Sequence, residues 1–124
     1  MPSPRPARIL GAYALAPAID DVPAVAAFYD GLRELPLDAI ELPLMAPGHP
    51  SLDAAWQHRH LHSDWQLVVT AIPRTMVRLG SNPAYGLASS DEDGRRAALA
   101  DLADVRDLAQ RLADDAGHSR VIAV

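Results

Sequence analysis

The chain has 124 residues, of which 49% are hydrophobic and 22% charged, a composition typical of one globular domain. The formal net charge of -5 and the scattered arginines predict that the protein does not bind nucleic acid. Lysine and cysteine are both absent, which excludes lysine Schiff bases, disulfides and thiolate nucleophiles within these residues. No apolar run approaches the roughly 18 residues of a membrane span, and the lack of cysteine favours a cytoplasmic location.

Four short apolar segments are predicted to be strands. Residues 1–8 contain three prolines and no long apolar run, so we expect a loose lead-in rather than a signal peptide. The first strand is expected over 8–16, where Pro17 follows it. The others are expected over 39–44, 65–72 and 120–124, and the third of them is rich in β-branched residues.

Two helical segments are predicted among the first three strands. Asp20 or Asp21 can cap the first of them, with Pro23 in its first turn. Its apolar residues recur at spacings of three and four up to Leu32, as on one face of a helix. A shorter helix is expected over about 52–61.

A third helical segment is predicted before the last strand. It begins at Ser89 or Ser90, either of which matches a capping box, and ends at Gly117, a residue suited to a left-handed cap. The stretch 74–90 before it is polar and rich in glycine and proline, so we expect a long loop there. One face of the helix is predicted to carry Ala98, Leu102, Val105, Ala109, Leu112 and Ala116.

The alternation of strands and helices predicts an α/β fold with about four parallel strands and three helical segments. Both a TIM barrel and a doubly wound sheet fit this pattern, but no G-x-G-x-x-G motif follows the first strand to support dinucleotide binding. A parallel sheet of four strands has two open edges, and the last strand has no loop after it. We therefore expect a chain truncated at its fourth strand.

Several segments resemble a family of xylose-isomerase-like TIM barrels. The resemblance is carried by Gly11–Pro17, Ile40–Pro43, Val69–Met76 and Tyr85–Ser89, and it extends from about residue 9 to the end of the chain. It implies that 9–124 form the N-terminal part of a (β/α)8 barrel domain. The wider superfamily includes sugar isomerases, sugar epimerases and an apurinic endonuclease branch. Its metal ligands come from later strands, so the resemblance implies no metal site here and a divalent metal in a longer parent protein.

Glu41 is the candidate catalytic residue. It is a carboxylate in an apolar strand, near the end where parallel barrels place their chemistry. Burial there would raise its pKa and suit it to acid/base work, whereas a structural carboxylate would bind backbone N–H groups or an arginine. The resemblance matches Glu41 to an acidic residue that often ends the second strand of such barrels.

Five residues are candidates for substrate binding. Arg74 follows the third strand and could bind an anionic sugar or phosphate. Alternatively, Arg74 and Arg78 could be two solvated arginines at the start of a helix. Tyr85 could cover a sugar ring as part of a lid, or could anchor a surface loop. The resemblance places three more positions near the loop face: Tyr13, Thr70 and Ser89.

Two further patterns are predicted not to bind metal. His58, His60 and His62 form an H-x-H-x-H run, but it precedes the third strand and so lies at the end opposite barrel chemistry. The acidic run 91–93 does not fit a calcium loop, because Ala100 stands where the bidentate glutamate belongs. We interpret these acids as favourable charges at a helix N-terminus.

Three functions remain open on this evidence. The resemblance implies a parent protein that isomerises or epimerises a sugar or sugar phosphate, and this segment alone would be inactive. A non-catalytic barrel that binds a small polyol is the first alternative. The second is a half-barrel that needs the missing barrel half or a second copy to cover its edges.

Overall fold

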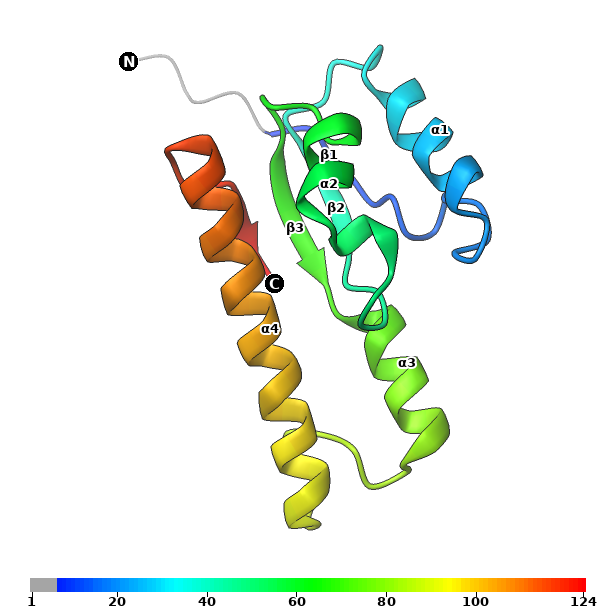
Figure 1. Cartoon of the computed structure of the whole chain (residues 1–124), viewed down its shortest axis with the longest axis vertical. Helices are drawn as coiled ribbons and strands as arrows, with labels where there is room; N and C mark the ends of the chain where they lie inside the picture. Colours follow the sequence, from blue (N-terminus) through cyan, green and yellow to red (C-terminus); the bar gives the residue numbers. More distant parts are fainter. Residues whose placement is uncertain (1–6) are drawn as a thin grey trace.

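The computed structural model describes residues 7–124, so residues 1–6 of the lead-in predicted over 1–8 lie outside the described residues. Within the described range the chain forms one sheet, four α-helices and one short 3-10 helix (Figure 1). The strands are β1 (Ile9–Leu10), β2 (Ala39–Pro43), β3 (Gln66–Thr70) and β4 (Val121–Ala123). The helices are α1 (Val22–Leu32), η1 (Pro50–Leu52, 3-10), α2 (Ala54–His60), α3 (Ile72–Ser81) and α4 (Glu92–Ala116).

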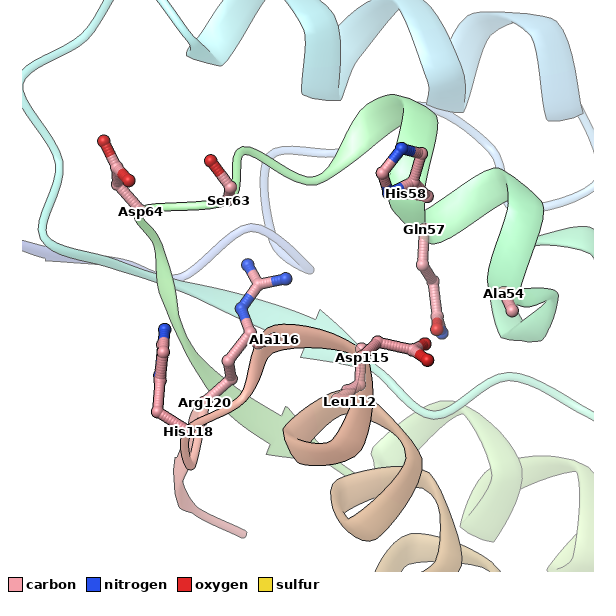
Figure 2. A pocket seen from close by; sticks show the side chains of 10 residues that line it. All are labelled: Ala54, Gln57, His58, Ser63, Asp64, Leu112, Asp115, Ala116, His118 and Arg120. Atoms are coloured by element: carbon pink, nitrogen blue, oxygen red, sulfur yellow. The ribbon is translucent and has the colours of Figure 1, made fainter.

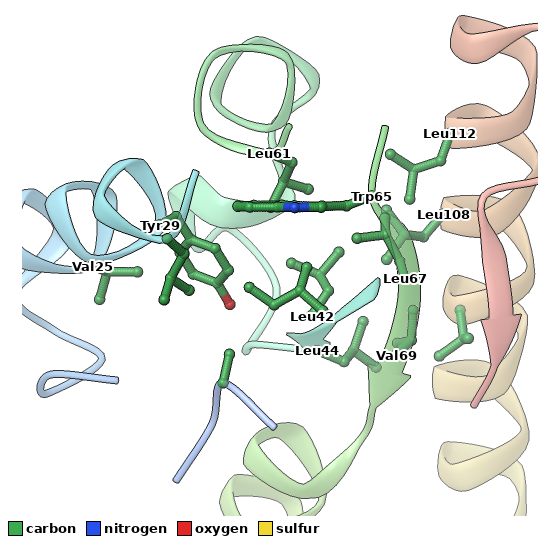
Figure 3. Packing of buried hydrophobic residues seen from close by; sticks show 14 residues of the cluster. Val25, Tyr29, Leu42, Leu44, Leu61, Trp65, Leu67, Val69, Leu108 and Leu112 are labelled. Atoms are coloured by element: carbon green, nitrogen blue, oxygen red, sulfur yellow. The ribbon is translucent and has the colours of Figure 1, made fainter. Parts of the chain in front are cut away.

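The sheet is parallel throughout, as the sequence predicts, and its strand order is β1-β2-β3-β4. Residues of α1 and α4 share one hydrophobic core with the strands, and Trp56 of α2 packs against it (Figure 3). The Trp56 ring meets the Tyr29 ring of α1 edge to face, with 5.6 Å between centroids. Since α1, α2 and α4 cover the same face, the architecture is α/β and consistent with part of a TIM barrel rather than a doubly wound sheet.

The strands alternate between two faces, and this alternation positions the candidate catalytic residue. Ile40 and Leu42 of β2 point into the core beneath the helices. Glu41 lies between them and therefore projects from the other face, which faces the interior in a complete barrel. Thr70 of β3 is half-buried and lies two pairs beyond the Glu41–Val68 pair, on the same face as Glu41.

The segment 74–90, predicted to be a long loop, contains most of helix α3, so the count of three helical segments is wrong for residues 7–124. Pro73 directly follows the strand expected over 65–72, but it occupies the first turn of α3, where its missing N–H group breaks no helical hydrogen bond. The helix α3 and the first half of α4 extend beyond the carboxyl ends of the strands (Figure 1). Residues 82–91 connect the two helices.

Other boundaries differ from the prediction in detail. The first strand has two residues instead of nine, because the backbone turns at Ala12, whose carbonyl accepts hydrogen bonds from the N–H groups of Leu15 and Ala16. Asp21 caps α1 and Gly117 ends α4 with a φ of 74°, as predicted. The cap of α4 is Asp91 rather than a serine. The buried face of α4 is rotated from the prediction and carries Gly94, Ala98, Asp101, Val105, Leu108 and Leu112.

Candidate functional site

Glu41 is the middle residue of β2 and lies one position beyond the last β1–β2 pair, beside the segment that leaves β1. Its Oε2 accepts a hydrogen bond of 2.7 Å from the backbone N–H of Tyr13. That N–H is available because β1 ends at Leu10, so Tyr13 has no partner in a strand ladder. Within residues 7–124, Oε1 of Glu41 accepts no hydrogen bond, which leaves one oxygen of this half-buried carboxylate able to meet a ligand.

Tyr29 supports the backbone at the same position. Its hydroxyl donates a hydrogen bond of 3.3 Å to the backbone carbonyl of Glu41, and its side chain is 2% exposed. Burial and the negative charge of Glu41 raise the pKa of Tyr29 far above its usual value. Tyr29 therefore stays protonated, and it joins α1 to the strand end that carries Glu41.

The structure gathers three of the predicted site residues around this strand end. Tyr13 is bonded to Glu41 through its backbone, and its ring is 36% exposed. Thr70 shares the face of Glu41 on the neighbouring strand. A carboxylate with one open oxygen, a threonine hydroxyl and a tyrosine can bind the hydroxyl groups of a polyol and move a proton.

Arg74 and Tyr85 belong to a second cluster, centred on Asp101 of α4. The hydroxyl of Tyr85 donates to Oδ2 of Asp101 over 3.0 Å, and Arg78 binds both carboxylate oxygens over 2.9 Å. Nη1 of Arg74 lies 3.3 Å from Oδ1 of Asp101. The alternative role suggested for Tyr85, an anchor for the loop, accounts for this bond.

The second cluster is largely satisfied internally. Arg74 is 3% exposed, and it also binds Asp104 over 2.5 Å and the Met45 carbonyl over 2.9 Å, so it is not a solvated residue. Burial raises the pKa of Asp101, but hydrogen bonds from Arg78 and Tyr85 and the charges of both arginines outweigh burial and lower it. The sequence analysis missed Asp101, although it lies three residues after Ala98 and four before Val105, in the buried helical period.

Ser89 lies apart from both clusters at the start of α4. Its hydroxyl accepts a hydrogen bond of 3.1 Å from the N–H of Asp91, and its carbonyl accepts one of 2.7 Å from Arg95. These bonds hold the turn that precedes the helix. Among residues 7–124, Ser89 makes no hydrogen bond with Glu41 or Asp101.

The histidine run has local partners. Nδ1 of His60 lies 2.9 Å from a carboxylate oxygen of Asp30, and Nδ1 of His62 accepts a hydrogen bond of 3.1 Å from the Asp64 N–H. In the described part of the chain, no group of three or more histidine, aspartate or glutamate residues is arranged to hold a metal ion. Glu41 alone does not form a metal site, so no chemical step here is assigned to a metal.

A cavity of about 350 Å³ lies at the opposite end of the sheet, where β3 and β4 begin (Figure 2). Its polar lining mixes histidines and Arg120 with Asp64 and Asp115. The buried Arg120 donates to the carbonyls of His62 and Trp65 over 2.7 to 3.2 Å, which ties the start of β4 to that of β3. In parallel α/β barrels this end serves stability rather than chemistry, so Glu41 marks the better candidate site.

The fold and this site define the class of the protein: parallel βα units with a carboxylate in the second strand, on the face opposite the helices. Residues 9–124 match the family described as a domain of unknown function, DUF4862, and the chain belongs to that family. An uncharacterised protein of Salmonella typhimurium is 39% identical over 94 residues, which cover 73% of this chain and 30% of that relative. No solved structure matches the chain. No helix within residues 7–124 has both the length and the apolar character to cross a membrane.

Proposed function

We propose that Glu41 is an acid/base residue of a barrel enzyme that isomerises or epimerises a sugar or sugar phosphate. The observation that carries this proposal is the state of its carboxylate. One oxygen is held by the Tyr13 N–H, and the other accepts no hydrogen bond from residues 7–124. A carboxylate fixed at one oxygen and open at the other is suited to exchange a proton with a bound substrate.

The chemistry also requires groups beyond this segment. Removing a proton next to a carbonyl leaves a negative oxygen that must be stabilised, commonly by a metal or by hydrogen-bond donors. Tyr13 and Thr70 can bind substrate hydroxyls beside Glu41, and a divalent metal would have to come from ligands on other strands. We leave Arg74 and Tyr85 out of the sugar site, because their polar groups are bound to Asp101.

We propose further that the natural protein forms a complete barrel. Ile9 of β1 and Ile122 of β4 are 51% and 45% exposed on the two edge strands, so further strands could pair there and cover them. The greater length of the Salmonella relative supports the same idea. We place the enzyme in the cytoplasm, on the ground that the 124 residues contain no cysteine.

A polyol-binding barrel without catalysis is the second candidate. The observation in its favour is that Glu41 is the one carboxylate that the structure places on the barrel-facing side of strands β2 and β3. Such a protein would hold the same ligand through Tyr13, Glu41 and Thr70 but would exchange no proton with it.

Exchange of a substrate proton with solvent tests the two candidates. The natural gene product, with any further segments that it carries, is incubated in D₂O with a panel of aldoses, ketoses and their phosphates, and ¹H NMR follows loss of the proton next to the carbonyl. The proposal expects exchange with at least one sugar and a fall of roughly 100-fold in Glu41→Gln. The control Glu34→Gln alters an exposed glutamate after α1 and should leave the rate unchanged.

Two results would contradict the enzyme proposal. Exchange that persists at the wild-type rate in Glu41→Gln would remove Glu41 from the chemistry. Saturable sugar binding without exchange, weakened in Glu41→Gln, would instead support the polyol-binding barrel.

A further inference from the structure

A pocket of about 260 Å³ lies between α3, α4 and the segment that connects them. Leu44 and Ala71, which directly follow β2 and β3, contribute to its lining, so the pocket is at the carboxyl end of the sheet. Open parallel α/β sheets bind their ligands at this end. Most of the remaining lining is apolar and comes from Leu87, Ala98, Leu102 and Val105.

The polar residues of this pocket balance in charge. Arg74 and Asp101 line the pocket, and they form ion pairs with Asp104 and Arg78. The network therefore contains two positive and two negative side chains. Both oxygens of Asp101 are already hydrogen-bonded. A charged ligand would have to displace one of these pairs, so the site favours an uncharged one.

A hydrogen-bond donor nevertheless remains in this network. Arg74 uses Nε and Nη1 for its bonds, whereas its Nη2 donates to no oxygen of residues 7–124. Trp56 Nε1 is the one fully buried polar side-chain atom of residues 7–124 that has no partner, so Nη2 of Arg74 keeps access to solvent and can donate to an acceptor that reaches it. Tyr85 adds a hydroxyl oxygen that donates to Asp101 and can accept from a ligand.

We propose that this pocket binds a small uncharged molecule with an apolar ring or short aliphatic body and one carbonyl or hydroxyl oxygen. The apolar lining takes the body, and the ligand oxygen accepts from Arg74. A ligand hydroxyl can also donate to the Tyr85 oxygen. An engineered apolar cavity of roughly 150 Å³ holds benzene, so this volume admits a substituted ring. A free sugar does not fit, because too few polar groups line the pocket for its hydroxyls. The ligand is separate from the substrate proposed for Glu41.

Saturation-transfer NMR with acetophenone, on the natural gene product, tests this pocket. We expect a dissociation constant on the order of 1 mM, and weaker binding of ethylbenzene, which has the same body without the oxygen. Leu102→Trp should fill the pocket from a 40% exposed position on α4 and weaken acetophenone binding at least tenfold. Leu87→Trp, in the segment that connects α3 and α4, should weaken acetophenone binding in the same way. The control Leu99→Trp lies on the same helix outside the pocket and should leave binding unchanged.

The proposal has clear points of failure. Absence of acetophenone binding, or equal binding in Leu102→Trp and Leu87→Trp, would overturn it. Tighter binding of benzoate than of acetophenone would overturn the uncharged class of ligand. Equal binding of ethylbenzene would overturn the role of the oxygen. None of these results depends on Glu41, so failure here leaves the exchange experiment untouched.

Discussion

Glu41 and Asp101 are carboxylates on opposite sides of the sheet, one on β2 and the other on α4, and their surroundings differ completely. Asp101 accepts hydrogen bonds from Arg74, Arg78 and Tyr85 and is 4% exposed. Glu41 accepts one hydrogen bond from a backbone N–H within residues 7–124 and is half-buried. One carboxylate has its hydrogen-bonding capacity filled by the fold, and the other has capacity left.

The difference separates stability from chemistry. A buried carboxylate that is surrounded by cations contributes to folding mainly because removing it leaves those cations unpaired. A carboxylate with an open oxygen contributes less to folding and can exchange a proton with a ligand. Asp101 therefore belongs to the ion-paired contact between α3 and α4, called the joint below, and Glu41 belongs to the candidate site.

The largest effect is expected when Asp101 loses its charge. Asp101→Asn leaves Arg74 and Arg78 without their shared carboxylate, and we expect a loss of about 3 to 4 kcal/mol in the free energy of unfolding. Urea unfolding measures it. Asp107→Asn on the same helix is the control, because Asp107 pairs with Arg106 at the surface, and its loss should stay below about 1 kcal/mol. Equal losses of stability in both variants would contradict the role of Asp101 in holding α3 and α4 together.

Gly94 tests the packing of the same joint without touching a charge. A Cβ at Gly94 would overlap the backbone carbonyl of Ala84, which lies in the segment between α3 and α4. We expect Gly94→Ala to lower the free energy of unfolding by about 2 to 3 kcal/mol. Gly80→Ala, in α3 and with open space around it, should instead stabilise the helix by up to about 1 kcal/mol. A stable Gly94→Ala protein would indicate a looser contact between the segment and α4.

Acid titration tests the surroundings of Asp101. The pKa of Asp101 is lower in the folded protein than its usual value of 3.8, so the folded state binds protons less readily than the unfolded state. The stability that Asp101 contributes is complete above that value and is lost as the pH falls through the folded pKa. The difference in unfolding free energy between wild type and Asp101→Asn should stay constant from about pH 7 to 5 and shrink below about pH 4. A difference independent of pH would contradict the lowered pKa.

The fold was predictable from the sequence because its signals are local. The apolar runs at β2 and β3 and the cap at Asp21 depend on neighbouring residues only. The helix α3 was missed because Pro73 is equally compatible with the end of a strand and the first turn of a helix. The strand β1 is short because the backbone turns at Ala12, and the Tyr13 N–H then binds Glu41, a partner that is distant in sequence.

The candidate site was predictable only in part. Glu41 stands out as an acid in an apolar strand, and the structure places it at the middle of β2, while its role at the site stays a prediction. The partners of Arg74 are Asp101 and Asp104 of α4. The helix face that the sequence predicts to be buried includes Leu102 and leaves both of them out. Asp101 breaks the usual pattern of apolar buried positions, and only the arginines of another helix explain it.

The smallest effect on stability, and the sharpest test of the comparison, is expected for Glu41→Gln. Glutamine keeps the volume and an oxygen that can accept from the Tyr13 N–H, so the bond weakens without being lost. We expect the free energy of unfolding to fall by about 1 kcal/mol or less, measured by urea unfolding beside Asp101→Asn. A small loss of stability together with the roughly 100-fold fall in proton exchange would assign Glu41 to chemistry. A loss as large as that of Asp101→Asn would instead make Glu41 a second structural carboxylate, bound to the backbone where β1 leaves the sheet.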